Sequence, residues 1–439
     1  MKNNNKYPKV LIIYHSRINK ADQYGVSIRG WLDEWPKENL AQIYSGGEVG
    51  EETFFGYNFK LGHNERRFGK LFFKLKGSSI GQSSYSIELN QERSKLDKHS
   101  FWSLLKHKFG KWLICTGLWE LIFKPKFSQE MIKFIEDFNP QVIYCQGYVL
   151  TFAWLPVMIH EKFKIPICFQ TGDDWPAYLY RDSPLSFAIR PIVRRAVKML
   201  LAKSSARLAN GNKMAKEYFE KYGMSFETMM MCDSLSRFSK AVSQRVVNND
   251  TISILYVGRL GHYRWVSIVD LCKAAELLNN EGYKIKVTIF ATVIPPEAIN
   301  TLTKLNNLQI LPGPSHEELP SYLKGGDILY LPETFDPMEA DSIRLSLSTK
   351  AHLYMMSEKP ILVYSSPVTG IMNYAKEEGW ACIVQEQNIN KLKQALHNLI
   401  VNHEYRKELI NKGVKVALKN HDEDKVRARF LTILKQLIY

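Results

Sequence analysis

Residues 252–267 read ISILYVGRLGHYRWVS, and this stretch decides how the chain is expected to fold. It opens with Ile252 to Val257, an apolar run rich in β-branched residues, as a buried parallel strand requires. Gly258 follows directly and lets the chain turn sharply at the end of the strand. Val266 to Leu278 then has the apolar spacing of an amphipathic helix. The stretch therefore predicts a strand, a tight turn and a helix, which is the repeating unit of an α/β fold.

Two arginines lie at this turn, and their position indicates a phosphate site. Arg259 and Arg264 are five residues apart, between the end of the strand and the helix. Backbone N–H groups and the positive end of a helix favour an anion, and arginine side chains bind its oxygens in pairs. An ordinary turn with two solvated arginines is the alternative, and this stretch alone does not decide between the two interpretations.

The composition is that of a globular protein with an anionic partner. The 439 residues are 45% hydrophobic and 23% charged, and the formal net charge at pH 7 is +15. This length favours two to three domains, and the charge favours nucleic acid, a phosphorylated small molecule or a membrane surface. No run of about 18 apolar residues occurs, and the N-terminal apolar run, Val10 to Tyr14, is too short for a signal peptide. The six cysteines show no C-x-x-C spacing, which argues against a zinc site and favours a reducing cytosol.

Strands and helices alternate along most of the chain. The strands expected in the first half are Val10–Tyr14, Ala41–Tyr44, Gln141–Cys145, Ile165–Phe169, Ala206–Ala209 and Met229–Cys232. Those expected after Ile252–Val257 are Lys286–Phe290, Leu308–Leu311, Asp327–Leu331, Pro360–Tyr364 and Ala381–Val384. The polar segment Phe238 to Asp250 predicts a linker. We therefore expect an α/β protein with two Rossmann-like, doubly wound domains that face a ligand cleft.

The expected domain limits follow from the linker. An N-terminal domain should span 1–245 and a C-terminal domain 250–420. The last helix, within 421–439, is expected to pack back on the N-terminal domain.

Three residues of the first half are candidates for a ligand site. Asp173 and Asp174 follow an expected strand, at the sheet edge where α/β proteins bind ligands. They either contact a ligand or cap the next turn. Gly25 precedes a helix expected at Val26 to Trp35, and it either lets a phosphate approach the backbone or simply begins the helix.

A basic and aromatic region, Phe68 to Phe127, lies between these elements. From Lys98 onward it carries Phe, Leu and Trp at near-helical spacing among six lysines. Such a helix can lie in the headgroup region of a membrane. The alternative, which is the commoner role of an amphipathic helix, is to pack its apolar side on the protein core. Gly46 to Lys98 gives no clear assignment.

These motifs together resemble the GT-B glycosyltransferases, in particular retaining family 4. In that family the second domain opens with a strand, then Gly-Arg-Leu, and a lysine five residues after the arginine. Gly258, Arg259, Leu260 and Arg264 stand at those places in this chain. Other segments similar to the family are Asn139–Gly147, Phe169–Trp175, Ser204–Gly223, Glu317–Pro332 and Ser348–Tyr364. No single motif is specific, but their order and spacing are.

The resemblance implies transfer of a sugar from a nucleotide-diphosphate-sugar to a glycan or lipid-linked acceptor, with retention of configuration. Arg259 and Arg264 would stabilise the diphosphate leaving group, and Asp173 or Asp174 would orient the acceptor hydroxyl. The residues implied in donor binding are Gly25, Gly258, Glu339, Asp341, Ser348, Thr349 and Lys350, with Arg344 as a further candidate. For Lys350 the alternative is a solvated lysine at the start of a helix. Neither a divalent metal nor another cofactor is expected.

The expected setting is the cytoplasm, where the chain would contact the inner face of the plasma membrane during cell-surface polysaccharide synthesis. Nucleic acid is not expected as a partner, because only the charge suggests it and no nucleic-acid-binding motif supports it.

One pair of positions departs from the family. Family 4 usually carries two glutamates eight residues apart, the second of which binds the ribose hydroxyls. Counted from Lys350, those positions hold Leu345 and Leu353. Glu333 and Asp341 are also eight residues apart, but they are out of register with Lys350, and we attribute their spacing to coincidence. The departure leaves two alternatives to an active transferase, a related binding protein without catalysis and a nucleotide-sugar epimerase of the same fold.

Overall fold

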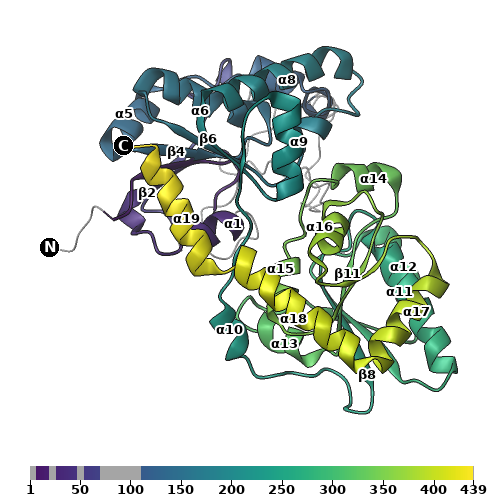
Figure 1. Cartoon of the computed structure of the whole chain (residues 1–439). Helices are drawn as coiled ribbons and strands as arrows, with labels where there is room; N and C mark the ends of the chain where they lie inside the picture. The colour runs from purple at the N-terminus through teal and green to yellow at the C-terminus, as the bar shows by residue number, and fades with distance from the viewer. Residues whose placement is uncertain (1–5, 19–25, 47–53, 70–109, 439) are drawn as a thin grey trace, which may run out of the picture. The chain divides into compact units, whose positions relative to one another are not determined.

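The computed structural model describes residues 6–18, 26–46, 54–69 and 110–438, and the chain divides into two compact units (Figure 1). The first unit comprises Met1–Met229 and Arg427–Tyr439, and the second comprises Met230–Val426. The linker expected at Phe238 to Asp250 therefore lies inside the second unit. No helix in the described ranges is long and apolar enough to cross a membrane.

The first unit is built on a parallel sheet with the strand order β3-β2-β1-β4-β5-β6-β7. The strands are β1 (Val10–Ile13), β2 (Leu40–Tyr44), β3 (Tyr57–Lys60), β4 (Val142–Cys145), β5 (Ile167–Thr171), β6 (Ser204–Ala209) and β7 (Glu227–Thr228). The helices are α1 (Val26–Leu32), α4 (Leu118–Ile122), α5 (Gln129–Phe138), α6 (Leu150–Phe163), α7 (Trp175–Tyr178), α8 (Ser186–Lys203) and α9 (Asn212–Tyr222), with a short 3-10 turn at Lys37–Asn39. This order, which grows outward from β1 in both directions, is that of a doubly wound Rossmann-like sheet.

The second unit repeats the pattern with the strand order β10-β9-β8-β11-β12-β13. Its strands are β8 (Ile252–Gly258), β9 (Ile285–Ala291), β10 (Leu308–Pro312), β11 (Ile328–Pro332), β12 (Ile361–Tyr364) and β13 (Cys382–Val384). Its helices are α10 (Leu235–Ser239), α11 (Arg264–Asn280), α12 (Pro296–Leu302), α13 (Leu319–Gly325), α14 (Pro337–Ser342), α15 (Ala351–Met356), α16 (Gly370–Glu378), α17 (Ile389–Val401) and α18 (His403–Asn420). Helix α19 (Glu423–Gln436) begins in this unit, but most of it belongs to the first. The expected α/β fold with two Rossmann-like sheets is thus confirmed.

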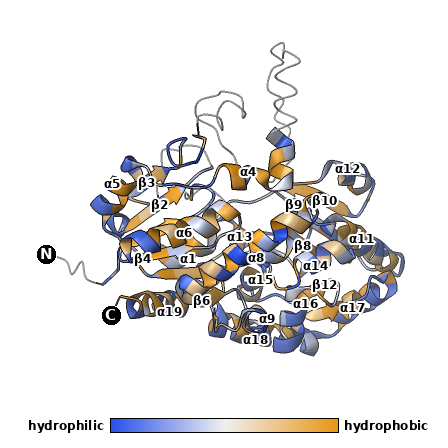
Figure 2. Cartoon of the chain, turned by 90° about the horizontal axis from the view of Figure 1, so that it is seen from above, coloured by the Kyte–Doolittle hydropathy of each residue, from blue (hydrophilic) through white to orange (hydrophobic). Residues whose placement is uncertain are grey.

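The apolar runs of the sequence form these sheets because both of their faces are covered by helices. Every residue of β1, β2, β4, β5, β11 and β12 is buried, as central strands of parallel sheets must be. Helices begin where polar side chains accept backbone hydrogen bonds, as at Ser128 before α5 and Asn388 before α17. Figure 2 shows α6 coloured mainly as hydrophobic, whereas α17 and α18 carry hydrophilic residues.

Several element limits differ from the sequence-based expectation. The strand expected at Met229–Cys232 is wrong, because β7 pairs with β6 and ends before Met229, and Met230 already belongs to the second unit. Helix α11 begins at Arg264, before the expected Val266. The last helix, α19, leaves the second unit at Arg427, whose Nε donates to the carbonyl of Gly30 at 2.8 Å.

Part of the basic and aromatic region is described. Residues 110–116 are helical, and Leu113, Trp119 and Phe123 form a small buried cluster. Trp112 is exposed. The described part of this region thus packs some of its apolar side chains on the protein and exposes others, and most of Phe68 to Phe127 lies outside the described residues.

Candidate functional site

The site lies at the carboxyl edge of the sheet in the second unit, where β8 ends. Gly258 is the last residue of β8 and has φ +142°. A Cβ atom at this position would lie 2.2 Å from Cε and 3.1 Å from Nζ of Lys350. Only a residue without a side chain therefore allows the lysine to approach the end of the strand. Lys350 Nζ also lies 5.5 Å from the ring centroid of Tyr256, within cation–π range.

A buried ion pair lies beside this lysine. Arg264, the first residue of α11, donates from Nε to Oε2 of Glu333 at 2.5 Å, and the two side chains are 15% and 3% exposed. Glu333 directly follows β11, the neighbour of β8 in the sheet. Its backbone is fixed from two sides, because its N–H donates to the carbonyl of Tyr364 and its carbonyl accepts from Oγ of Ser267 at 2.7 Å. The arginine is therefore held in one orientation.

The site contains more cationic than anionic side chains. The pKa of Lys350 is lowered to about 8, chiefly by burial and then by Arg264 and Arg259, while Glu333 opposes this. Burial also acts to lower the pKa of Arg264, but Glu333 and Tyr256 outweigh it, so this pKa is raised. The carboxylates that act on this site, Glu333 and more weakly Glu339, are fewer than its three cations, so an anion between the cations would be stabilised.

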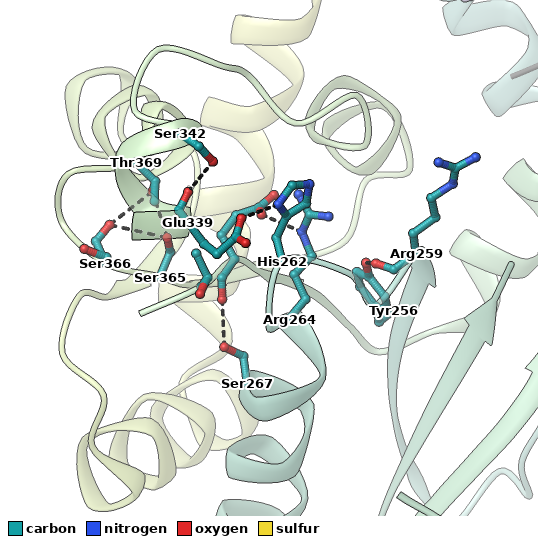
Figure 3. Close-up of polar contacts among 12 residues, drawn as sticks. Tyr256, Arg259, His262, Arg264, Ser267, Glu339, Ser342, Ser365, Ser366 and Thr369 are labelled. Atoms are coloured by element: carbon teal, nitrogen blue, oxygen red, sulfur yellow. Dashed lines mark hydrogen bonds and ion pairs between the residues drawn. The ribbon is translucent and has the colours of Figure 1, made fainter. Parts of the chain in front are cut away.

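Arg259 lies apart from the ion pair. The hydroxyl of Tyr256 donates to the carbonyl of Arg259 at 2.6 Å and fixes the backbone of the loop. Figure 3 shows the guanidinium of Arg259 directed away from Arg264 and His262. The two arginines that the sequence places on one loop therefore point in different directions.

One further residue of the loop, His262, contacts helix α14. His262 and Tyr263 have φ values of +55° and +54°, which are uncommon for residues other than glycine. Nδ1 of His262 lies 2.5 Å from Oε2 of Glu339. Glu339 is itself placed by Asp336, which accepts from its backbone N–H at the start of α14. The loop after β8 is thus held against α14 (Figure 3).

The remaining candidates of the second unit lie in more exposed places. Asp341 is exposed and pairs with Arg344 at 3.8 Å, so it does not share the buried surroundings of Glu333. Ser348 is partly buried and Thr349 is exposed, and both precede α15 next to Lys350. Hydroxyl groups gather near α16, with Oγ of Ser365 2.7 Å from Oγ1 of Thr369 (Figure 3).

The leucines at the two family glutamate positions pack in the protein interior. Leu345 is 2% exposed, and Leu353 is partly buried against the core cluster that contains Met355 and Trp380. Neither side chain is fully exposed, so leucine in place of the family's glutamate is compatible with the fold at both positions.

The two acidic candidates of the first unit have different surroundings. Asp174 is buried, accepts from the hydroxyl of Tyr218 at 2.8 Å and lies 3.9 Å from Nζ of Lys221. Asp173 is partly exposed, and its Oδ2 lies 3.4 Å from the hydroxyl of Tyr148. Asp174 therefore holds helix α9 in place, and Asp173 is the more exposed of the two acids. Gly25 lies outside the described residues.

Sequence reasoning missed the role of Glu333. Its signal was present, because an acidic residue that directly follows a buried strand lies at the same sheet edge as Gly258. Its partner, however, lies 69 residues earlier in the chain, and spacing does not reveal that contact.

Comparison with known proteins supports the fold. No protein-family model matches the sequence, and no curated protein matches it. Among solved structures, sucrose-phosphate synthase from Thermosynechococcus elongatus is similar, with a TM-score of 0.63 and 11% identity over 98% of each chain. An α,α-trehalose 6-phosphate synthase from Burkholderia multivorans has a TM-score of 0.61 and 12% identity over 98% of this chain and 97% of that chain.

A third similar structure is described as trehalose-6-phosphate from E. coli bound with UDP-2-fluoro glucose. Its TM-score is 0.60 and its identity 13%, over 97% of this chain and 99% of that chain. The likeness extends over almost the whole chain, so the expected GT-B fold is confirmed. The assignment to family 4 in particular stays a prediction.

Proposed function

We propose that this chain is a glycosyltransferase that uses a nucleotide-diphosphate-sugar. The observation that carries the proposal is the approach of Lys350 to Gly258 beside the buried Arg264–Glu333 pair. A diphosphate is the anion that best fits cations fixed at a strand end and at the start of α11. The names of the similar structures, one of which contains UDP-2-fluoro glucose, agree with this choice.

In the proposed reaction the cations act on the leaving group. As the bond between the sugar and the diphosphate breaks, negative charge develops on the departing phosphate oxygen, and Lys350 and Arg264 would stabilise it without having to reorient. Arg259, Gly258, Ser348, Thr349 and Glu339 remain proposed donor contacts. Asp173 is the proposed contact for the acceptor hydroxyl, since Asp174 is occupied by Tyr218. We further propose that configuration is retained and that no divalent metal takes part.

Two classes of acceptor are candidates for the transferred sugar. The family resemblance points to a glycan or lipid-linked acceptor of cell-surface polysaccharide synthesis. The similar structures are named as synthases of sucrose phosphate and trehalose 6-phosphate, which points to a sugar phosphate instead. Transfer from the same donor to a hexose phosphate and to a lipid-linked saccharide, measured side by side, would decide between them.

The first experiment is a thermal-shift panel with UDP, GDP, ADP and TDP. A ligand at about 100 times its dissociation constant adds roughly 2.7 kcal/mol of stability, so one nucleotide should raise the midpoint clearly. Lys350→Met should abolish the shift. Lys324→Met, which removes a lysine from helix α13 of the same unit, is the matched control and should keep it. If no nucleotide shifts the midpoint of the wild type, the donor site is refuted.

The alternatives differ in the step after nucleotide binding. A transferase releases the nucleoside diphosphate only when acceptor is present. A binding protein without catalysis shows the thermal shift but no release, and an epimerase converts the sugar while the donor stays intact. Incubation with the donor chosen by the panel, and then chromatography of nucleotides and sugars, separates the three.

The lowered pKa of Lys350 leads to a prediction about pH. Lys350 with a pKa of about 8 loses its proton as the pH rises through 8, whereas a lysine with an ordinary pKa stays charged. The terminal phosphate, with a pKa near 6, is already ionised. Between pH 7 and pH 9 we therefore expect the affinity for the nucleoside diphosphate to fall by about tenfold. Calorimetric titration at several pH values measures this.

Two variants control that measurement. Lys350→Arg keeps its charge throughout this pH range and should remove the pH dependence. Lys350→Met should bind weakly at every pH. If the affinity of Lys350→Met falls with pH as steeply as that of the wild type, another group is responsible.

A further inference from the structure

Helix α8 of the first unit is a strongly basic helix. Its sequence, Ser186 to Lys203, contains five cationic side chains and no acidic one. One side of it packs into the core of the first unit through Val193, Val197 and Leu200. The opposite side is exposed and has no part in the proposed function.

The exposed side carries a stripe of one apolar residue and three cations. The helical spacing places four residues on one face of α8. Arg194 follows Phe187 by two turns, and Arg195 and Lys198 lie within the next turn: the four are Phe187, Arg194, Arg195 and Lys198. All four are exposed, and Phe187 is 77% exposed. We call these four residues the α8 stripe.

The cations of the α8 stripe are not neutralised within the described residues. Arg194, Arg195 and Lys198 form no ion pair there, whereas the guanidinium of Arg190 on the same helix donates to the carbonyls of Pro176 and Leu179. Of the neighbouring acids, Glu161 of α6 lies 3.7 Å from Lys203, and Asp182 lies 3.5 Å from Arg181. The stripe therefore presents net positive charge next to an exposed aromatic ring.

A short helical segment with two exposed apolar side chains is bonded to the loop that precedes α8. The helical segment 110–116 is joined to it by a hydrogen bond of 3.2 Å from Oγ of Ser183 to the carbonyl of Thr116. This segment exposes Trp112, which is 48% exposed, and Ile114. Two residues that are two positions apart on a helix do not share a face, so Trp112 and Ile114 form no continuous patch and are not counted in the α8 stripe.

We propose that the α8 stripe docks the first unit on an anionic lipid bilayer. Phosphate headgroups would contact Arg194, Arg195 and Lys198, and the ring of Phe187 would insert at the boundary with the acyl chains. A nucleic-acid duplex would use the cations but not the exposed aromatic ring beside them, because its bases are already stacked on one another. The proposal does not depend on the proposed transferase activity, and the α8 stripe lies outside Phe68 to Phe127, the region from which membrane contact is expected in the sequence.

The test is sedimentation of the full chain with vesicles of phosphatidylcholine, with or without phosphatidylglycerol. The wild type should bind the anionic vesicles, and high salt should weaken binding. The triple variant Arg194→Gln/Arg195→Gln/Lys198→Gln should lower the partition coefficient roughly a hundredfold, because each cation near an anionic surface contributes about fivefold. Phe187→Ser should lower it several-fold at any salt concentration.

A matched variant removes the same charge elsewhere. Lys376, Lys407 and Lys415 are exposed lysines of the second unit, and Lys376→Gln/Lys407→Gln/Lys415→Gln should bind vesicles like the wild type. Equal loss in both triple variants would mean that only net charge matters and would overturn the proposal. Binding to heparin or DNA with no binding to vesicles would overturn it as well. The thermal shift with nucleotide is expected to be unchanged in all these variants, so a failed donor site and a failed membrane surface are distinguishable.

Discussion

Replacing Arg264 with methionine is expected to destabilise the second unit by about 3–5 kcal/mol. The substitution leaves the carboxylate of Glu333, which is 3% exposed, without its partner in the interior. A buried carboxylate that has lost its hydrogen-bonded arginine costs far more than an exposed pair contributes, and the charge of Lys350 compensates only part of this cost. For a unit of this size the thermal midpoint should fall by roughly 10 °C, measured by circular dichroism without ligand.

Two variants show whether the loss comes from the buried charge. Asp250→Asn removes the 2.7 Å ion pair with Lys284, in which both groups are exposed, and should leave the midpoint nearly unchanged. Arg264→Met/Glu333→Met replaces both charges with apolar groups and should recover most of the stability, while nucleotide binding stays lost. A midpoint for Arg264→Met as high as that of Asp250→Asn would show that the pair does not stabilise the fold.

The sheets could be predicted from the sequence because their strands are continuous apolar runs. An apolar run such as Ile252 to Val257 is best buried as a central parallel strand, and the observed strand β8 includes all of it. The limits of short edge strands were less predictable. β7 has two residues, so pairing with β6, rather than the pattern of its own side chains, decides where it lies.

The candidate site was predictable only in part, because its contacts join distant segments. Gly258 and Lys350 come together from positions 92 residues apart, and the sequence motif indicated both. The motif did not indicate that Glu333 would hold Arg264, nor that Arg259 would point away from it. Asp173 and Asp174 are adjacent in the sequence, and contacts with Tyr218 and Lys221 of helix α9, which the sequence does not reveal, make Asp174 structural.

Gly258→Ala is expected to weaken the binding of the nucleoside diphosphate at least tenfold. The new Cβ would lie 2.2 Å from Cε of Lys350, so the lysine has to move away from the strand end. Because the obstructed atom belongs to a flexible side chain, the fold should survive, but a charge-assisted hydrogen bond worth about 1.5–3 kcal/mol would be lost. Calorimetric titration of the nucleotide into both proteins measures the change.

A second glycine separates this effect from backbone strain. Gly282 has φ +98°, and a Cβ there would meet nothing within 4 Å, so Gly282→Ala has a similar conformational cost without displacing a side chain. Its affinity for the nucleotide should equal that of the wild type. In Gly258→Ala/Lys350→Met the two losses should not add, since both remove the same ammonium group from the same place. Full additivity would mean that Gly258 acts on the ligand directly, through its own backbone, rather than by admitting Lys350.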